Sequence, residues 1–273
     1  MLLATLLLTA PFAGAVEIVD AVFRQYENGP EQDARHEYRG GDVVWFDCRV
    51  QGYARTEETD PRFALTWNAG VIDARRQAVT RAKQGKLSGE LTDEDKAYRP
   101  RIRFDVALPP LLLPGRYVIG VAVDDEIDKT KKTATFEIKV GGRAMEIPKE
   151  LTAAQLRFLR QEDDRRPLDA ATYRPGDPVW LRFEIMGFRH GESNKIDVEY
   201  GLLVLGPSGQ PFLRQDPASG HTAESYYPQF YVPASVRIEL PPKATAGEYI
   251  VVLSLRDKVS GQSAAARTSF TVE

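Results

Sequence analysis

Apolar and polar residues alternate in short runs along most of the chain. The apolar set at positions 179, 181, 183 and 185 stands at every second place, with Arg182, Glu184 and Trp180 on the other face, and positions 103–108 alternate in the same way. A period of two places successive side chains on opposite faces of a strand, so one face of each run is expected to be buried. Turn-forming residues separate the runs, and no helical segment of comparable length competes with them. The pattern therefore predicts an all-β protein.

The two halves of the chain repeat each other. Residues 38–45 read YRGGDVVW and residues 173–180 read YRPGDPVW, and the LPP of residues 108–110 returns at 240–242. Such self-similarity is the mark of an internal duplication. Short strands with turns at intervals of about 8–12 residues are typical of an antiparallel sandwich. We therefore predict two tandem immunoglobulin-like antiparallel β-sandwiches.

The repeat also sets the expected domain boundaries. The first sandwich is assigned to residues 16–142 and the second to residues 143–273, with a short linker at about 141–155 near Gly141 and Gly142. Good helix formers at residues 149–160 also allow a helical linker, although the repeat assigns part of them to a strand. Each half contains a long connection, at residues 80–101 and 214–234, which is either a loop or an edge strand.

The turn motifs of the repeat resemble those of a known family. Residues 174–181 and 247–255 carry a Pro-Gly-Asp turn before one strand and a Gly-x-Tyr start of another, which resembles the macroglobulin-type immunoglobulin-like domain. Similar punctuation occurs in other bacterial sandwich modules, including those near the fibronectin type III architecture. The chain lacks the Cys-Gly-Glu-Gln thioester site of full macroglobulins, since Cys48 is followed by Arg49. The resemblance thus implies a tandem sandwich module without covalent trapping.

The N-terminal residues differ in composition from the rest of the chain. Residues 2–12 are almost wholly apolar, and the Ala-Gly-Ala of residues 13–15 is the small-residue pattern that precedes signal cleavage. The run is shorter than the ~20 residues that a membrane span needs. We expect a signal peptide at residues 1–15, with a buried strand or helix as the alternative. The mature protein is then exported, periplasmic or extracellular, with no membrane span.

The net charge bears on the kinds of partner to expect, and the cysteine content bears on disulfide bonding. The chain has 36 Lys and Arg against 39 Asp and Glu, a net charge of −3, which gives no electrostatic reason to expect nucleic acid or an anionic membrane as a partner. Cys48 is the single cysteine, so no intramolecular disulfide can form. We interpret it as a buried, inert thiol.

The motifs that could signal an enzyme do not form a catalytic pattern. The Gly-Pro-Ser-Gly of residues 206–209, with Asp216 and His221 nearby, superficially resembles a nucleophile elbow, but its context is strand, turn and strand. His36, His190 and His221 are isolated in the sequence, so no metal site is expected from them. We predict that the protein is not an enzyme and holds no cofactor.

Two groups of acidic residues have a plain structural interpretation. The candidate calcium ligands are Asp124, Asp125, Glu126 and Asp128, but lysines follow directly and the second half lacks the cluster, so a solvated hairpin is preferred. Asp42 and Asp177 each follow a glycine at the entry to a strand. We expect these two carboxylates to close their turns by hydrogen bonds to the backbone.

Aromatic residues concentrate in the long connection of the second half. Tyr226, Tyr227, Phe230 and Tyr231 form a candidate contact surface for a protein or a glycan, or they pack onto the sandwich as part of an edge strand. The sequence therefore predicts an exported, non-catalytic binding or scaffolding protein. The alternative is a carbohydrate- or protein-binding accessory subunit that uses these four rings.

Overall fold

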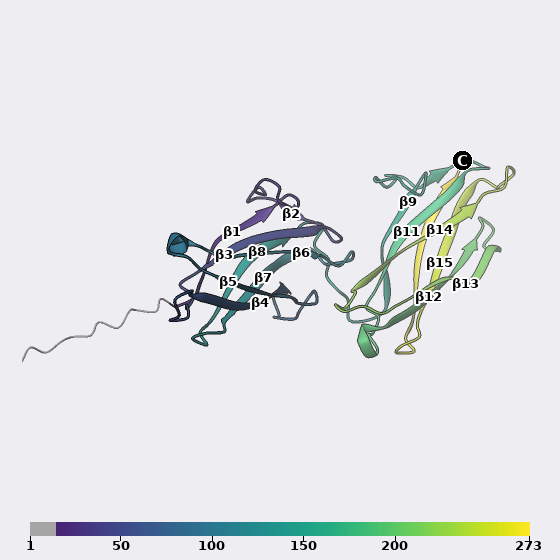
Figure 1. The fold of residues 1–273 in the computed structure, drawn as a ribbon. Helices are drawn as coiled ribbons and strands as arrows, with labels where there is room; N and C mark the ends of the chain where they lie inside the picture. The colour runs from purple at the N-terminus through teal and green to yellow at the C-terminus, as the bar shows by residue number, and fades with distance from the viewer. Residues whose placement is uncertain (1–14) are drawn as a thin grey trace, which may run out of the picture. The chain divides into compact units, whose positions relative to one another are not determined.

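The computed structural model describes residues 15–273, so all but the last residue of the expected signal peptide lies outside the described part. The described residues separate into two compact units, which divide between Ala144 and Met145 (Figure 1). Within the described residues, no helix is long and apolar enough to cross a membrane. Each unit is a sandwich of two β-sheets.

The first unit packs a three-stranded sheet on a five-stranded one. The small sheet has the order β1 (Glu17–Arg24), β3 (Val43–Gln51), β6 (Arg101–Ala107). The large sheet has the order β2 (Glu37–Tyr38), β8 (Lys131–Val140), β7 (Gly115–Asp125), β4 (Arg62–Ile72), β5 (Lys83–Glu90). All neighbours are antiparallel except β2 and β8, and the 3-10 turn η1 (Asp93–Ala97) joins β5 to β6.

The second unit repeats this strand order. Its small sheet runs β9 (Thr152–Leu159), β11 (Pro178–Met186), β14 (Tyr231–Glu239). Its large sheet runs β10 (Thr172–Tyr173), β16 (Ser263–Val272), β15 (Gly247–Asp257), β12 (Ile196–Leu205), β13 (Pro211–Ala223), with the 3-10 turn η2 (Glu192–Asn194) before β12. The identical order confirms the predicted pair of immunoglobulin-like sandwiches from an internal duplication.

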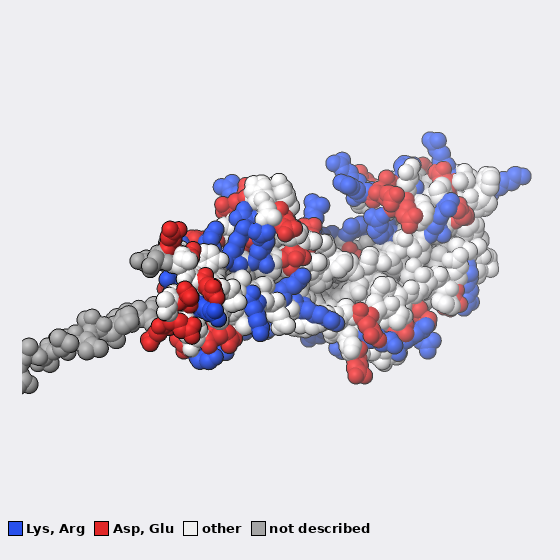
Figure 2. Space-filling view, in the orientation of Figure 1, with Lys and Arg blue, Asp and Glu red and all other residues white. Residues whose placement is uncertain are grey.

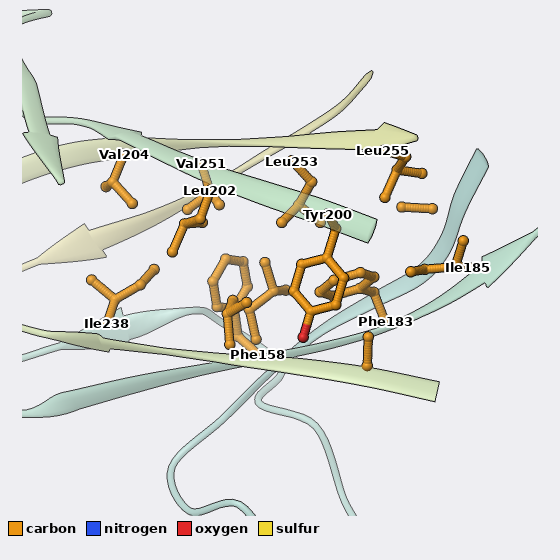
Figure 3. Close-up of a cluster of buried hydrophobic side chains, with 14 of the residues drawn as sticks. Phe158, Phe183, Ile185, Tyr200, Leu202, Val204, Ile238, Val251, Leu253 and Leu255 are labelled. Carbon is orange, nitrogen blue, oxygen red and sulfur yellow. The ribbon is translucent and has the colours of Figure 1, made fainter. Parts of the chain in front are cut away.

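The alternating pattern produces the core. The inward-facing residues of β11, at positions 179, 181, 183 and 185, are at most 1% exposed, and they face Leu202 on β12 and Leu253 on β15 (Figure 3). Each buried side chain of this size contributes about 1.5–3 kcal/mol relative to its exposed state. The two sheets are therefore held together by side chains that the period of two assigns to one face.

A pair of turn contacts recurs in both units. The carboxylates of Asp42 and Asp177 accept hydrogen bonds from the backbone N–H groups of Arg39 at 2.7 Å and Arg174 at 2.8 Å. The predicted structural role of both aspartates is confirmed, because each carboxylate closes the turn that precedes its strand.

A tyrosine corner also recurs. The hydroxyl of Tyr117 donates to the carbonyl of Leu113 at 2.8 Å, and the hydroxyl of Tyr249 donates to the carbonyl of Thr245 at 3.1 Å. A tyrosine at the start of this strand, bonded to the backbone a few residues upstream, is a hallmark of immunoglobulin-like sandwiches.

Two open questions about the connections are resolved. Residues 80–101 and 214–234 are not mainly loops, because β5 and β13 occupy much of them as edge strands. The helical interpretation of residues 149–160 is wrong, because β9 begins at Thr152 and pairs with β11. The pairing gained along β11 outweighs the helix propensity of this stretch.

Candidate functional site

The four aromatic residues singled out in the second half lie around the start of β14. Tyr226 is 52% exposed, Tyr227 is 8% exposed, and Phe230 and Tyr231 are partly buried. The side-chain amide of Asn194 donates to the carbonyls of Ser225 at 3.1 Å and Tyr226 at 2.9 Å, which fixes the segment that carries these rings.

Most of these rings pack inward at one end of the second sandwich. Tyr227 lies edge-on to Phe230 with centroids 6.0 Å apart, and Phe230 lies 6.1 Å from the ring of His190. Burial, and then the charge of Glu184, raise the pKa of the Tyr231 hydroxyl. The structure thus offers a single well-exposed ring, that of Tyr226, rather than a platform of four.

The candidate calcium ligands are engaged with the protein. Asp124 pairs with Lys131 at 2.6 Å, Glu126 accepts a hydrogen bond from Thr66, and Asp128 accepts two from Thr130. Asp125 is buried and accepts the backbone N–H of Ala54 at 2.6 Å and that of Ile127 at 2.9 Å. Within residues 15–273, no group of three acidic, histidine or cysteine side chains gathers in a metal-binding arrangement.

The serine of the superficial elbow motif and the isolated histidines His36 and His190 are each held in structural contacts. Ser208 lies in the tight turn between β12 and β13, where Gly209 N–H donates to the carbonyl of Gly206 at 2.8 Å. His190 bonds the carbonyl of Gln229 through Nε2, and His36 stacks edge-on against Tyr38. In the part of the chain that the structure describes, no hydrogen bond joins a serine to a histidine.

A groove lies on the first sandwich where the two sheets part. Here β5 and β6 are the edge strands of their sheets, and between them is a space of about 430 Å³. We call it the Trp67 groove, and its lining residues are Trp67, Gly85, Lys86, Leu87, Arg101 and Arg103.

Trp67 forms the floor of this groove. Its indole ring stacks on Phe104, with centroids 5.8 Å apart and an angle of 28° between the planes. Gly85 is the direct cross-strand partner of Trp67, and a Cβ at Gly85 would lie only 2.7 Å from the indole. The position of the indole therefore requires glycine on the neighbouring strand.

The second sandwich fills the same place. Tyr200 occupies the position of Trp67, since each stands on the strand two residues after the partner of the buried aspartate, Asp257 or Asp125. Tyr200 is 8% exposed, and its hydroxyl donates to the carbonyl of Ser235 across the gap at 3.2 Å. This position is thus open beside Trp67 in the first copy and covered by Tyr200 in the second. Sequence reasoning missed the groove because Trp67 follows the ordinary strand alternation.

Three arginines converge on one carboxylate beside the groove. The side chain of Asp47 is 5% exposed, Arg24 and Arg101 both donate to its Oδ2, and Arg103 Nε lies 3.3 Å from its Oδ1. Burial acts to raise the pKa of Asp47, but the hydrogen bonds and charges of Arg101 and Arg24 outweigh it and hold the pKa below 3.8.

This cluster leaves the groove positively charged. Three guanidinium groups face the buried Asp47 and the exposed Glu27, which lies 3.7 Å from Arg103, and Arg101 and Arg103 belong both to the cluster and to the groove wall. Figure 2 shows Lys and Arg side chains gathered over the middle of the first domain. Arg182 stands at the position of Asp47 in the second sandwich, so the cluster is also confined to the first copy.

The comparisons with known proteins add no family. No family model and no curated protein matches the chain. A solved structure of the C-terminal domain of the Streptococcus pyogenes antigen I/II-family protein AspA is 10% identical, with 95% of this chain and all of that chain covered, at a TM-score of 0.31. The C-terminal domain of the Streptococcus agalactiae AgI/II polypeptide BspA gives 10% identity, 94% and 100% coverage and a TM-score of 0.29. The chain is a tandem immunoglobulin-like sandwich protein on the strength of its own strand order.

Proposed function

We propose that this protein is an exported, non-catalytic binding protein that holds its partner in the Trp67 groove. The observation that supports it is the difference between the two copies. One closes the gap between its sheets with Tyr200, and the other leaves Trp67 and two arginines around an open space. An open, charged gap between the sheets does not stabilise the fold. Its presence in one copy is therefore explained if a ligand binds there.

The chemistry of the groove suits binding better than catalysis. Its volume lies within the range of ligand sites, about 300–1,000 Å³, and it combines an aromatic floor with a few polar side chains. Arginine stays protonated in proteins and cannot exchange protons as a general acid or base. Burial raises the pKa of the Cys48 thiol to about 12, so it supplies no thiolate nucleophile near neutral pH.

The second sandwich supports another contact, through Tyr226. Its ring is 52% exposed on a segment that Asn194 fixes to the domain. An exposed aromatic on a rigid segment is a common anchor in protein interfaces. This site is a second candidate for a protein or glycan partner.

The test is capture of the partner from the native compartment with the full mature chain, followed by hydrogen exchange on the complex. We expect protection of β5 and β6, loss of capture with Trp67→Ala, and retention with Trp67→Phe and Tyr226→Ala. Protection around Tyr226, with capture unaffected by Trp67→Ala, would reject the groove in favour of the second candidate. Fractionation and N-terminal sequencing test export, with cleavage expected after Ala15.

A further inference from the structure

We infer that the partner contributes an extended, acidic peptide segment, which binds as an added strand along the free edge of β5. This inference rests on the proposed function of the Trp67 groove. It follows from the backbone of β5, from the shape of the groove beside it and from its charge.

The edge of β5 is regular over its whole length. Eight consecutive pairs join it to β4, from Arg62 opposite Glu90 to Ala69 opposite Lys83, without a register shift and without proline. Just beyond them, Leu91 N–H donates to the carbonyl of Pro61 at 2.7 Å. Hydrogen-bonded pairs recur at every second position of an antiparallel ladder, so the odd-numbered residues of β5 turn their backbone groups toward β4.

The even-numbered residues then face outward. Gln84, Lys86, Ser88 and Glu90 present their N–H and C=O groups at the open edge of the sheet. A row of free backbone groups on an edge strand is the template for strand addition by an extended peptide.

The corresponding edge of the second sandwich is unsuited to such pairing. β13 contains Pro211 and Pro217, and its register shifts twice along β12. Proline lacks the N–H that a ladder needs, and irregular edges resist pairing with another chain. The regular edge and the open groove therefore occur together, in the same copy and on neighbouring strands.

The groove gives an added strand a place for its side chains. Gly85, Leu87 and Gly89 point inward from β5, where Gly85 lies against the indole of Trp67 and Gly89 against the ring of Phe63. An added strand would direct every second side chain inward, so an apolar residue would cover Trp67 and Leu87.

The charges around the edge select an acidic ligand. Lys86, Arg101 and Arg103 line the groove, Lys83 precedes it on β5, and Arg24 shares Asp47 with the two arginines. The acidic groups that face these cations are Asp47, Glu27 at 3.7 Å from Arg103, and Asp105 at 3.7 Å from Lys83. Five cations against three carboxylates leave positive charge for the ligand to neutralise. An acidic glycan shares this charge complementarity, but it has no use for the free backbone groups of β5, so a peptide is favoured.

The binding experiment uses the full mature chain and a fluorescent peptide of about ten alternating Glu and Val residues, a length that matches the edge strand. The comparison ligands are a Lys and Val peptide, the Glu and Val peptide with two central prolines, and an oligogalacturonate. We expect the first peptide to bind at least about tenfold more tightly than each of the other three. Equal binding of the proline-containing peptide, or binding of the oligogalacturonate alone, would overturn strand addition.

Variants of β5 test the same point from the protein side. Ser88→Pro removes one outward N–H without breaking a bond to β4. We therefore expect it to weaken binding of the Glu and Val peptide by about tenfold, while Ser88→Ala changes the affinity less than about twofold. Lys86→Glu should weaken binding without any change of backbone, which keeps the test valid if the proline variant unfolds.

The outcomes separate this inference from the proposed function. If the acidic peptide fails to bind while Trp67→Ala still abolishes partner capture, the groove binds a ligand of another kind and only strand addition is lost. If capture is insensitive to Trp67→Ala, the proposed function itself is lost. A dimer in sedimentation that Ser88→Pro dissociates would assign the edge to a second copy of this chain and overturn the acidic partner.

Discussion

Replacing Asp47 by asparagine should destabilise the first sandwich strongly, although the two side chains have nearly the same shape. Asp47 is the one buried carboxylate among Arg24, Arg101 and Arg103, and the other carboxylate beside them, Glu27, is 61% exposed and lies 3.7 Å from Arg103. Asparagine keeps the volume and one acceptor but removes the charge, so three guanidinium groups remain close together with only the exposed Glu27 as a counter-ion.

The size of the effect follows from the geometry. At an effective dielectric of about 20, one ion pair at 4 Å is worth about 4 kcal/mol, and the desolvation of the carboxylate offsets much of the total from three such pairs. The arginine side chains are 25%, 34% and 32% exposed, so water screens them in part. We therefore expect a loss of about 2–3 kcal/mol, below the 3–5 kcal/mol of a fully buried pair. For a domain of this size the loss lowers its Tm by about 6–12 °C.

The dependence on pH has a definite sign. The pKa of Asp47 is held below 3.8, so its ionised form binds the arginines in the folded protein and its contribution is complete above the unfolded pKa. The contribution is lost as the pH falls through the lower, folded pKa. The difference in stability between wild type and Asp47→Asn should therefore be constant near neutral pH and shrink below about pH 4.

Calorimetry of the full chain, with hydrogen exchange to assign each transition to its sandwich, measures both effects. Asp105→Asn is the matched control, because Asp105 is 46% exposed and lies 3.7 Å from Lys83, where an ion pair is worth less than about 1 kcal/mol. A loss below about 0.5 kcal/mol for Asp47→Asn, equal to that of the control and unchanged by acid, would refute the account of the cluster.

Three further changes test the structural roles of other buried groups. Asp257→Ala removes the acceptor of the Arg189 and Val259 N–H groups and should cost the second sandwich about 2–3 kcal/mol in calorimetry, with faster exchange at those two amides. Tyr249→Phe breaks the tyrosine corner and should cost about 0.5–1.5 kcal/mol in urea unfolding, with the midpoint rather than the slope changed. Cys48, whose pKa is raised to about 12 by burial, should react with a thiol reagent only in denaturant, and rapid labelling of the native protein would contradict its burial.

The sequence was sufficient for the fold because each strand carries its own signal. The alternation in β11 and the duplicated turns at Asp42 and Asp177 are local patterns, and local patterns can be recognised from the sequence alone. The edge strands β5 and β13 were left undecided because an edge strand has one pairing partner and carries many polar residues, so its alternation is weak.

The candidate site could not be predicted from the sequence, because its residues come together only in the folded protein. Asp47 lies 23 residues from Arg24 and 54 residues from Arg101, and only the pairing of β1, β3 and β6 brings the three together. Trp67 looks like any inward residue of a strand, and its exposure depends on the glycine opposite it. The aromatic run near Tyr226 was visible in the sequence, but its division into exposed and buried rings depends on Asn194 and His190 from another loop.

Comparison of the two copies distinguishes residues that both sandwiches need for folding from residues that occur in one sandwich. Both sandwiches keep the turn aspartate, the buried aspartate of the last hairpin and the tyrosine corner, and each of these has a hydrogen bond that explains it. The copies differ at three corresponding places: Asp47 in the first copy is replaced by Arg182 in the second, Trp67 is replaced by Tyr200, and the regular β5 is replaced by the proline-containing β13. Folding alone would favour the closed arrangement of the second copy, because Tyr200 buries its ring and bonds its hydroxyl. The open arrangement of the first gives up that burial, and a ligand that covers Trp67 restores it.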